Sequence, residues 1–244
     1  QNFAKAFDVK FQNEENKEEF VWATSWGVST RLVGAVILAH GDKKGLRLPP
    51  KIAPIQVILI PIYRDEEQKI NVDDYINSII NDLENDGIRY LVDWSDSSPG
   101  YKFNEWELKG VPIRMEIGPR DVESNKAILV RRDNGEKHAI SKEDVCAIAK
   151  NTLKEIQSGL FTQAKLFRDD NTHMVGSYDE FKKIIDSGGF IRCGWDGKEK
   201  TELKIKEETK ATIRCIPFDE NPENLNCIIS NKPAKHEVIY AKAY

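Results

Sequence analysis

The chain has 244 residues, of which 40% are hydrophobic and 31% are charged, and its formal net charge is −4. At roughly 100–200 residues per domain, this length allows one large domain or two to three small ones. The composition excludes a disordered chain, and no apolar run approaches the roughly 18 residues that a membrane-spanning helix needs, so no membrane partner is expected. Because the chain is slightly acidic, DNA is not an expected partner and any RNA site must be a local basic patch.

The cysteines and the first residues of the chain indicate the cellular compartment in which the protein is expected. Four cysteines, Cys146, Cys193, Cys215 and Cys227, form no CxxC pair, so they are interpreted as reduced thiols of a cytoplasmic protein. Cys146 and Cys215 are expected to pack in the interior. The chain begins at Gln1 without a basic segment followed by an apolar one, which indicates no signal peptide and leads us to expect that an N-terminal piece is missing.

The first fifty residues combine two patterns. Alternating apolar and polar side chains predict a long β-hairpin over residues 3–26. An apolar run follows Ser29 and Thr30, either of which can cap a helix, so a nearly all-buried helix is expected through Ala39. Pro49-Pro50 ends this part and marks the first domain boundary.

The following segment, residues 51–160, alternates predicted strands and helices. Strand-like apolar runs at 55–62 and 88–94 flank a helical pattern, and Asp73 and Asp74 are placed in the first turn of that helix, where the helix dipole favours acidic residues. A strand, a helix and a second strand in this order indicate the start of a βαβ unit.

The second half of this segment is predicted to add an antiparallel hairpin and a helix. Alternation over residues 111–117 places Arg114 and Glu116 on one face of a strand. Asp133-Asn134-Gly135 is a strong hairpin turn between two further strands. An amphipathic helix is expected over residues 141–160, with a capping box at its start.

The last segment, residues 161–244, is predicted to be a smaller unit. A helix is expected over residues 178–187, and strands are expected at 190–193, 211–217, 227–230 and 238–243. The predicted fold class is therefore α/β (α+β), with several mixed layers of helices and strands.

Two stretches of sequence resemble one enzyme family. The first is Thr24-Ser25-Trp26-Gly27-Val28-Ser29-Thr30-Arg31, continuing to His40-Gly41-Asp42 and Leu48-Pro49-Pro50. The second is Ser98-Pro99-Gly100-Tyr101-Lys102-Phe103-Asn104-Glu105-Trp106-Glu107-Leu108-Lys109-Gly110-Val111-Pro112-Ile113-Arg114, with Gly118-Pro119-Arg120-Asp121 after it. They resemble the third signature motif and the anticodon-binding domain of prolyl-tRNA synthetases of the archaeal/eukaryotic type, which are class II enzymes.

The resemblance implies three parts. Residues 1–50 would be the C-terminal part of the antiparallel-sheet catalytic core, 51–160 a mixed-sheet anticodon-binding domain, and 161–244 a small α/β C-terminal domain. Complete enzymes of this family are much longer. The resemblance therefore implies that the first two class II motifs lie upstream of Gln1, together with the core elements through which such enzymes form homodimers.

In the family's reaction, L-proline is activated by ATP, with Mg²⁺, to prolyl-adenylate and is then transferred to the 3′ end of tRNA(Pro). The resemblance assigns Arg31 to the ATP phosphates as the catalytic cation, which suits the need for fixed positive donors at developing phosphate charge. It assigns Ser29 and Gly27 to the nucleotide, and Trp26 with Gly27 to the proline pocket. Without the resemblance, Trp26 would more often be a core residue, and His40 is expected to be structural.

A basic and aromatic cluster lies at residues 101–120, where unstacked bases can rest on aromatic rings while Lys and Arg contact phosphates. The resemblance assigns Phe103, Glu107 and Arg114 to reading the two guanines of proline anticodons. Phe103 and Glu107 share a helix face at i and i+4. The residues expected to contact RNA are Lys102, Phe103, Glu107, Arg114 and Arg120.

Structural alternatives stay open for these residues. Phe103 could fill the core while Glu107 and Arg114 form a salt bridge with each other. Trp106 is expected in the core in either case. Arg131-Arg132 could contact the tRNA backbone, but a solvated pair on the hairpin is the expectation.

Family members often hold a structural zinc in the C-terminal domain with four cysteines. Cys193 and Cys227 match the first and third of these, but Lys198 and Ile229 stand at the second and fourth, so no zinc is expected. The resemblance also implies that the terminal carboxylate of Tyr244 folds back toward the active site, with a simple edge strand as the alternative.

The resemblance therefore implies the C-terminal half of a prolyl-tRNA synthetase, a half that should be inactive without the rest of the enzyme. The rival hypothesis is a non-catalytic fragment or paralogue that only binds tRNA. An unrelated α/β protein that binds small molecules is disfavoured, because no Gly-rich phosphate loop is present.

Overall fold

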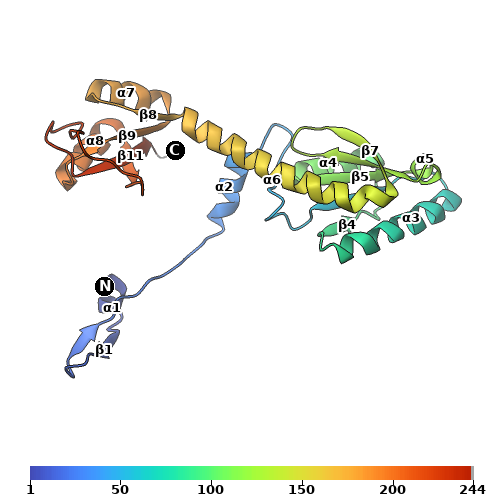
Figure 1. Ribbon diagram of the computed structural model, residues 1–244, viewed down its shortest axis with the longest axis horizontal. Helices are drawn as coiled ribbons and strands as arrows, with labels where there is room; N and C mark the ends of the chain where they lie inside the picture. Colours follow the sequence, from blue (N-terminus) through green and yellow to red (C-terminus); the bar gives the residue numbers. More distant parts are fainter. Residues whose placement is uncertain (243–244) are drawn as a thin grey trace.

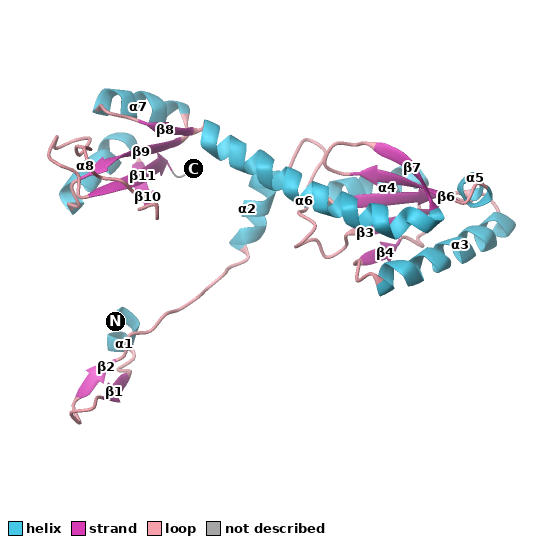
Figure 2. Cartoon of the chain, in the orientation of Figure 1, coloured by secondary structure: helices cyan, strands magenta, loops and turns pink. Residues whose placement is uncertain are grey.

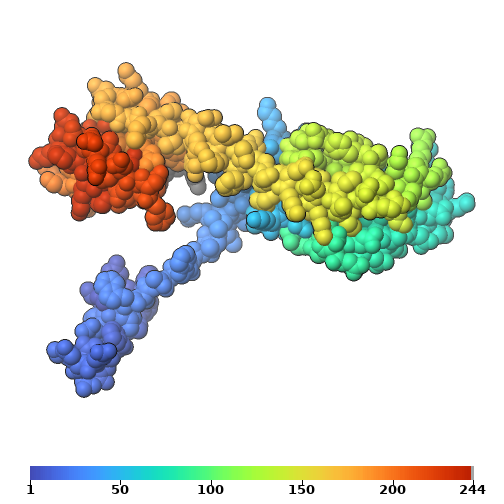
Figure 3. Space-filling model, in the orientation of Figure 1, coloured from blue at the N-terminus to red at the C-terminus, as the bar shows by residue number. Residues whose placement is uncertain are grey.

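The computed structural model of the chain describes residues 1–242. A small N-terminal arm leads through an extended segment into helix α2 (Arg31–His40), and two α/β units follow, joined by the long helix α6 (Val145–Asp170) (Figure 1). Figure 3 shows the arm as a narrow projection beside the two larger units. Helices and strands mix in both units, which confirms the predicted α/β class (Figure 2). Within the described residues, no helix is both long and apolar enough to cross a membrane.

The N-terminal arm differs from the predicted hairpin over residues 3–26. It begins with helix α1 (Asn2–Ala6), and strands β1 (Lys10–Gln12) and β2 (Glu18–Phe20) pair antiparallel over three residues each. The longer hairpin was wrong because Asp8 has a φ of 51°, which interrupts the alternation between Phe7 and Val9.

Helix α2 forms where it was expected but is not buried. None of its residues is buried, and Leu32, Val33 and Leu38 are more than half exposed. The prediction of a nearly all-buried helix was wrong because, among residues 1–242, α2 packs mainly along one side of α6.

The first α/β unit is built on a five-stranded sheet with the order β4-β3-β5-β6-β7. Strand β3 (Val57–Pro61) pairs parallel with β4 (Tyr90–Val92) and with β5 (Ile113–Ile117). Strands β6 (Lys126–Arg131) and β7 (Lys137–Ser141) continue antiparallel, so the sheet is mixed. The βαβ start and the hairpin at residues 133–135 are confirmed.

Helices lie on both faces of this sheet. Helices α3 (Glu66–Asn85) and α6 cover one face, where Leu59, Ile76 and Met115 form part of the main core. Helix α4 (Pro99–Lys109) covers the other face at β3, and the short helix α5 (Pro119–Glu123) follows β5.

The start of α3 lies earlier than predicted. The Asp65 side chain accepts a hydrogen bond from the Gln68 backbone N–H, which caps the helix, and Glu66 and Glu67 occupy the first turn. Asp73 and Asp74 therefore lie in the helix interior and not in its first turn.

Helix α6 is much longer than predicted. A 3-10 turn (Lys142–Asp144) precedes it, and it runs without a break for 26 residues, past the predicted end at Leu160. The proposed boundary between residues 160 and 161 thus lies inside a continuous helix. Cys146, near its start, is only partly buried, contrary to the expectation of an interior residue.

The second α/β unit has a four-stranded sheet with the order β10-β11-β9-β8. Its strands are β8 (Thr172–Met174), β9 (Phe190–Trp195), β10 (Ala211–Cys215) and β11 (His236–Lys242), and its helices are α7 (Tyr178–Ser187) and α8 (Glu199–Thr209). The predicted strand at 227–230 was wrong, because this segment is a turn joined to the sheet by one bridge between Gly194 and Cys227. Cys215 is exposed at the end of β10 and not packed inside.

Candidate nucleic-acid interface

The sheet face that α4 covers is apolar on strand β3 and charged on the neighbouring strand β5. Ile58 and Ile60 of β3 pack under α4 with Phe103 and Trp106. Their register partners on β5 are Arg114 and Glu116, which share the same face because paired residues point to the same side. The part of this face beneath α4 therefore belongs to the apolar core, whereas the part beside α4 is polar.

Three charged side chains form a row across this polar part of the face. Arg114 donates to Glu116 Oε1 through Nε at 3.1 Å and Nη2 at 3.0 Å, and Lys137 on β7 donates to Glu116 Oε2 at 2.5 Å. The Glu116 carboxylate is nearly buried, and it lies between the two cations, which compensate its charge. One positive charge remains in excess over the three residues, and Lys137 is the most exposed of them.

Phe103 and Arg114 contact each other directly. The Arg114 guanidinium carbon lies 4.4 Å from the centroid of the Phe103 ring, which is a cation–π stacking distance. The structure thus brings together two residues that the sequence analysis assigned to RNA. Nucleic-acid bases stack on Arg guanidinium planes as well as on aromatic rings, and here the Arg114 guanidinium lies over the ring of Phe103.

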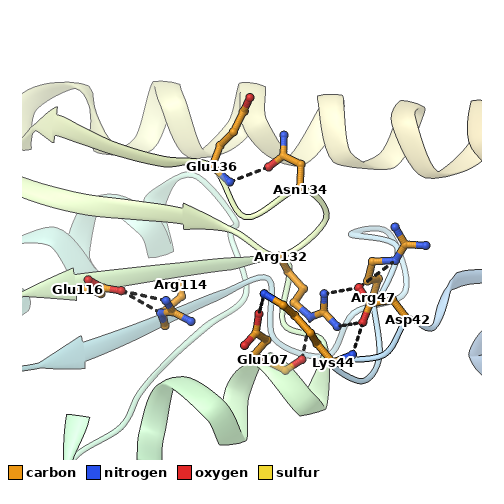
Figure 4. A network of polar contacts seen from close by, with 9 residues as sticks. All are labelled: Asp42, Lys44, Arg47, Glu107, Arg114, Glu116, Arg132, Asn134 and Glu136. Carbon is orange, nitrogen blue, oxygen red and sulfur yellow. Dashed lines mark hydrogen bonds and ion pairs between the residues drawn. The ribbon is translucent and has the colours of Figure 1, made fainter. Parts of the chain in front are cut away.

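Glu107 has a partner that the sequence did not predict. Its Oε1 accepts from the Nζ of Lys44 at 3.0 Å, while Arg114 pairs with Glu116, so the alternative of a salt bridge between Glu107 and Arg114 is wrong (Figure 4). A cavity of about 230 Å³ lies beside this pair and is lined by both Glu107 and Arg114.

Arg132 joins the segment of residues 41–48 to the sheet and to α4. Its two Nη atoms donate to the carboxylate of Asp42 at 2.8 and 2.7 Å, and its Nε donates to the backbone carbonyl of Glu107 at 2.8 Å (Figure 4). The hydrogen bond from Arg132 lowers the pKa of Asp42 well below its usual range, against the opposing effect of burial. Arg131 pairs with Asp133 and Glu155. The expectation of a solvated arginine pair was wrong, because both guanidinium groups are taken up by carboxylates.

Lys102 was also placed wrongly by the sequence reasoning. Its side chain is 4% exposed, and its Nζ donates to the backbone carbonyl of Asp93 at 2.8 Å. Trp106 Nε1 donates to Asp93 Oδ2 at 2.7 Å. Burial raises the pKa of Asp93, but hydrogen bonds from Ser95 and Trp106 outweigh it and the pKa is lowered. Lys102 therefore fastens α4 to the end of β4 and presents no ammonium group to a ligand.

Comparison with known proteins gives these elements a family. Residues 56–152 match the family described as "Anticodon binding domain", and residues 178–244 match "Prolyl-tRNA synthetase, C-terminal". The chain matches the C-terminal region of prolyl-tRNA synthetases.

Curated relatives agree with this match over the whole chain. Proteins named "Proline--tRNA ligase" from Bacteroides fragilis and Chlorobium phaeobacteroides are 49% and 51% identical over 249 and 253 residues. One from Porphyromonas gingivalis is 47% identical over 245 residues. Each alignment covers 100% of this chain but 50–52% of the relative, so the chain spans about half the length of the curated relatives it matches. These three relatives are bacterial.

Arg120 lies apart from the other residues that the sequence analysis assigned to RNA, although it belongs to the same region that matches the anticodon-binding family. It sits in α5, just beyond the carboxyl end of β5, whereas Arg114 lies near the amino end of the same strand. Arg120 lines a second cavity of about 390 Å³ with Arg64. The four residues on α4 and β5 and the single residue on α5 therefore do not form one continuous site.

The residues that resemble a prolyl-tRNA synthetase third motif lie on the exposed segment before α2. Trp26 is 96% exposed, and a side-chain carbon added at Gly27 would meet no other atom within 4 Å. The Oγ of Ser29 accepts from the backbone N–H of Arg31 at 3.4 Å, and Arg31 is the exposed first residue of α2. All four of these residues are exposed.

The region that matches the C-terminal family of prolyl-tRNA synthetases contains the two cysteines considered for zinc, Cys193 and Cys227. Cys193 and Cys227 are both buried, and burial raises the pKa of Cys193 to about 12, with the neighbouring Cys227 adding to the shift. Within residues 1–242, no group of three or more His, Cys, Asp or Glu side chains could hold a metal ion. Tyr244 lies outside the described residues.

Sequence reasoning missed two partners of this interface. Lys137 could have been found, because the hairpin register pairs Val130 with Lys137 and so places it on the face of Arg114. Lys44 gave no signal, because 63 residues separate it from Glu107.

Proposed function

We propose that this chain is the tRNA-binding half of an enzyme that activates L-proline with ATP and transfers it to tRNA(Pro). The support is near 50% identity, over the whole chain, to relatives named proline–tRNA ligase. The single observation that carries the tRNA assignment is the stacked pair of Phe103 and Arg114 beside Glu107, on the open part of a mixed sheet. We assign the enzyme to the archaeal/eukaryotic type on the motif at residues 98–114.

The proposed anticodon site uses each side chain for the chemistry it offers. Phe103 and Arg114 form the stacking surface, and Arg114 can also donate to guanine O6 and N7. The Glu107 carboxylate accepts from the two donors on the Watson–Crick edge of guanine. Lys137 meets the phosphate backbone, and Arg120 makes a separate contact with RNA beyond the end of the strand. Lys102 acts by positioning α4.

The proposed catalytic contribution comes from the segment that leads into α2. Arg31 meets the ATP phosphates, Ser29 and Gly27 meet the nucleotide, and Trp26 with Gly27 borders the proline. Arg31 suits this role because it stands exposed at the amino end of a 10-residue helix, where the helix dipole also favours anions, and no carboxylate pairs with it within residues 1–242. Mg²⁺ would enter with the ATP.

The remaining assignments follow from the same proposal. The full enzyme is a cytoplasmic homodimer that needs no structural zinc at Cys193 and Cys227. The alternative is a paralogue that binds tRNA without catalysis. Proline-dependent exchange between ATP and pyrophosphate separates the two: the full-length protein should catalyse it and the 244-residue chain should not.

Paired substitutions in the full-length protein test which residues serve which step. Glu107→Ala should weaken aminoacylation of tRNA(Pro) while leaving proline-dependent pyrophosphate exchange intact, and Arg31→Ala should abolish both. Glu105→Ala is the matched control on α4, because in the part of the chain that the structure describes Glu105 forms an ion pair only with Lys109 on the same helix. Equal loss of both activities in Glu107→Ala would refute the anticodon assignment.

A further inference from the structure

The Glu107 carboxylate is already occupied in the free protein. Lys44 Nζ lies 3.0 Å from Oε1, and the Glu107 side chain is 30% exposed, so the pair sits at the edge of the cavity beside Arg114. A guanine that donates from both N1–H and the N2 amino group needs both carboxylate oxygens. It would therefore have to remove the ammonium group from Oε1.

Lys44 is held at this position by a tightly connected turn. The Lys44 backbone N–H donates to Asp42 Oδ1 at 2.8 Å, and Asp42 and Gly45 exchange two backbone hydrogen bonds at 2.9 and 3.2 Å. Asp42 in turn receives both Nη atoms of Arg132 (Figure 4). The turn that carries Lys44 is thus anchored to the sheet and does not reach Glu107 by chance.

The chain after the turn is fixed to the end of α4. Leu46 donates its backbone N–H to Leu108 O at 2.9 Å, and Leu48 donates to Gly110 O at 3.0 Å. At Gly110, which has a φ of 76°, an added side-chain carbon would lie 2.5 Å from Leu46. The close approach leaves Lys44 directly over Glu107, which lies in the last turn of α4.

We propose that Lys44 competes with guanine for the carboxylate of Glu107 and so limits how strongly the site prefers guanine. The proposal rests on the anticodon-reading function proposed above for Glu107. Lys44 holds the carboxylate in place when no RNA is bound, and guanine displaces it on binding. A base that cannot donate twice gains nothing from that displacement, so Lys44 lowers the affinity for guanine more than for other bases.

The test uses the 244-residue chain and two hairpin RNAs, one with a proline anticodon loop and one with adenine at both guanine positions. Lys44→Ala is compared with Lys43→Ala. The control removes one positive charge from the preceding residue, whose side chain is exposed. Exposed ion pairs are weak, so Lys44→Ala should bind the guanine hairpin roughly two- to fivefold more tightly than Lys43→Ala does. Both variants should bind the adenine hairpin equally.

The same two lysine substitutions in a Glu107→Gln variant test whether the effect of Lys44 acts through the Glu107 carboxylate. In Glu107→Gln, the difference between the two lysine variants on the guanine hairpin should disappear. Equal affinities of the two lysine variants for the guanine hairpin, with wild-type binding intact, would overturn this inference alone. Failure of the wild-type chain to distinguish the two hairpins would overturn the proposed anticodon reading and this inference with it.

Discussion

Replacing Arg132 by alanine tests how firmly residues 41–48 are attached to the anticodon-binding domain. Arg132 is 5% exposed and donates three charge-assisted hydrogen bonds, two to Asp42 and one to the Glu107 carbonyl. Breaking a buried ion pair costs about 3–5 kcal/mol. The Asp42 side chain is 33% exposed, so its carboxylate regains water and the cost falls. We expect Arg132→Ala to lower the free energy of unfolding by about 2–3 kcal/mol.

Hydrogen exchange is the appropriate assay, because the chain has more than one folding unit and a single unfolding midpoint would mix them. Core amides of β3 and β5, such as those of Leu59 and Met115, report the opening free energy of this domain. Asp42→Asn alone should cost less than Arg132→Ala, and the double variant should cost less than the sum. Additive losses, or a loss below about 0.5 kcal/mol in Arg132→Ala, would refute the reasoning.

The difference in the free energy of unfolding between wild type and Arg132→Ala should depend on pH through the ionisation of Asp42. Arg132 lowers the pKa of Asp42 in the folded protein, so the pair's contribution is fully present above the ordinary aspartate pKa of about 3.9. It is lost as the pH falls through that value toward the lower folded pKa. The stability gap between wild type and Arg132→Ala should therefore be constant from pH 8 to about 5 and narrow below about 4. A gap that widens on acidification would contradict this assignment.

Three further substitutions distinguish residues that stabilise the fold from a residue that is proposed to contact RNA. Lys102→Met should destabilise the domain by about 2–4 kcal/mol, measured by the same exchange assay, while the folded fraction keeps its affinity for the guanine hairpin. Gly110→Ala should cost about 1–3 kcal/mol more than Gly87→Ala, because both have a positive φ but only Gly110 faces a neighbour, and the comparison fails if the two variants are equal. Arg114→Ala should weaken hairpin binding by about tenfold or more in a fluorescence anisotropy titration, whereas unchanged affinity would remove Arg114 from the site.

The sequence predicted the first α/β unit well where local signals were strong. The hairpin turn at residues 133–135 and the alternation over 111–117 each depend on neighbouring residues, and both patterns are present in the structure. The helix beginning at 145 was cut short at residue 160 because the apolar face was traced only to that point, although its last ten residues carry exposed apolar side chains such as Phe161 and Phe167. Exposed apolar residues do not mark a helix end.

The charged residues show why the site itself was harder to predict. A lysine before an aromatic residue in a basic cluster suggests phosphate contact, but Lys102 points inward to a backbone carbonyl that lies nine residues earlier. The partners of Arg132 and Glu107 lie 90 and 63 residues away in sequence, respectively. No local periodicity reports such pairs, because they arise only when residues 41–48 cross the end of α4.

The balance of charges at the candidate interface bears on how an acidic chain could bind RNA in the proposed way. Arg114 and Lys137 pair with Glu116, and Lys44 pairs with Glu107, so these three cations meet two carboxylates. An excess this small provides little general attraction for phosphates. Affinity would then have to come from stacking and from paired hydrogen bonds to base edges, which also determine sequence preference. Both carboxylates therefore have a use in the proposed site: Glu116 holds Arg114 in position, and Glu107 is the acceptor for which we propose that Lys44 and guanine compete.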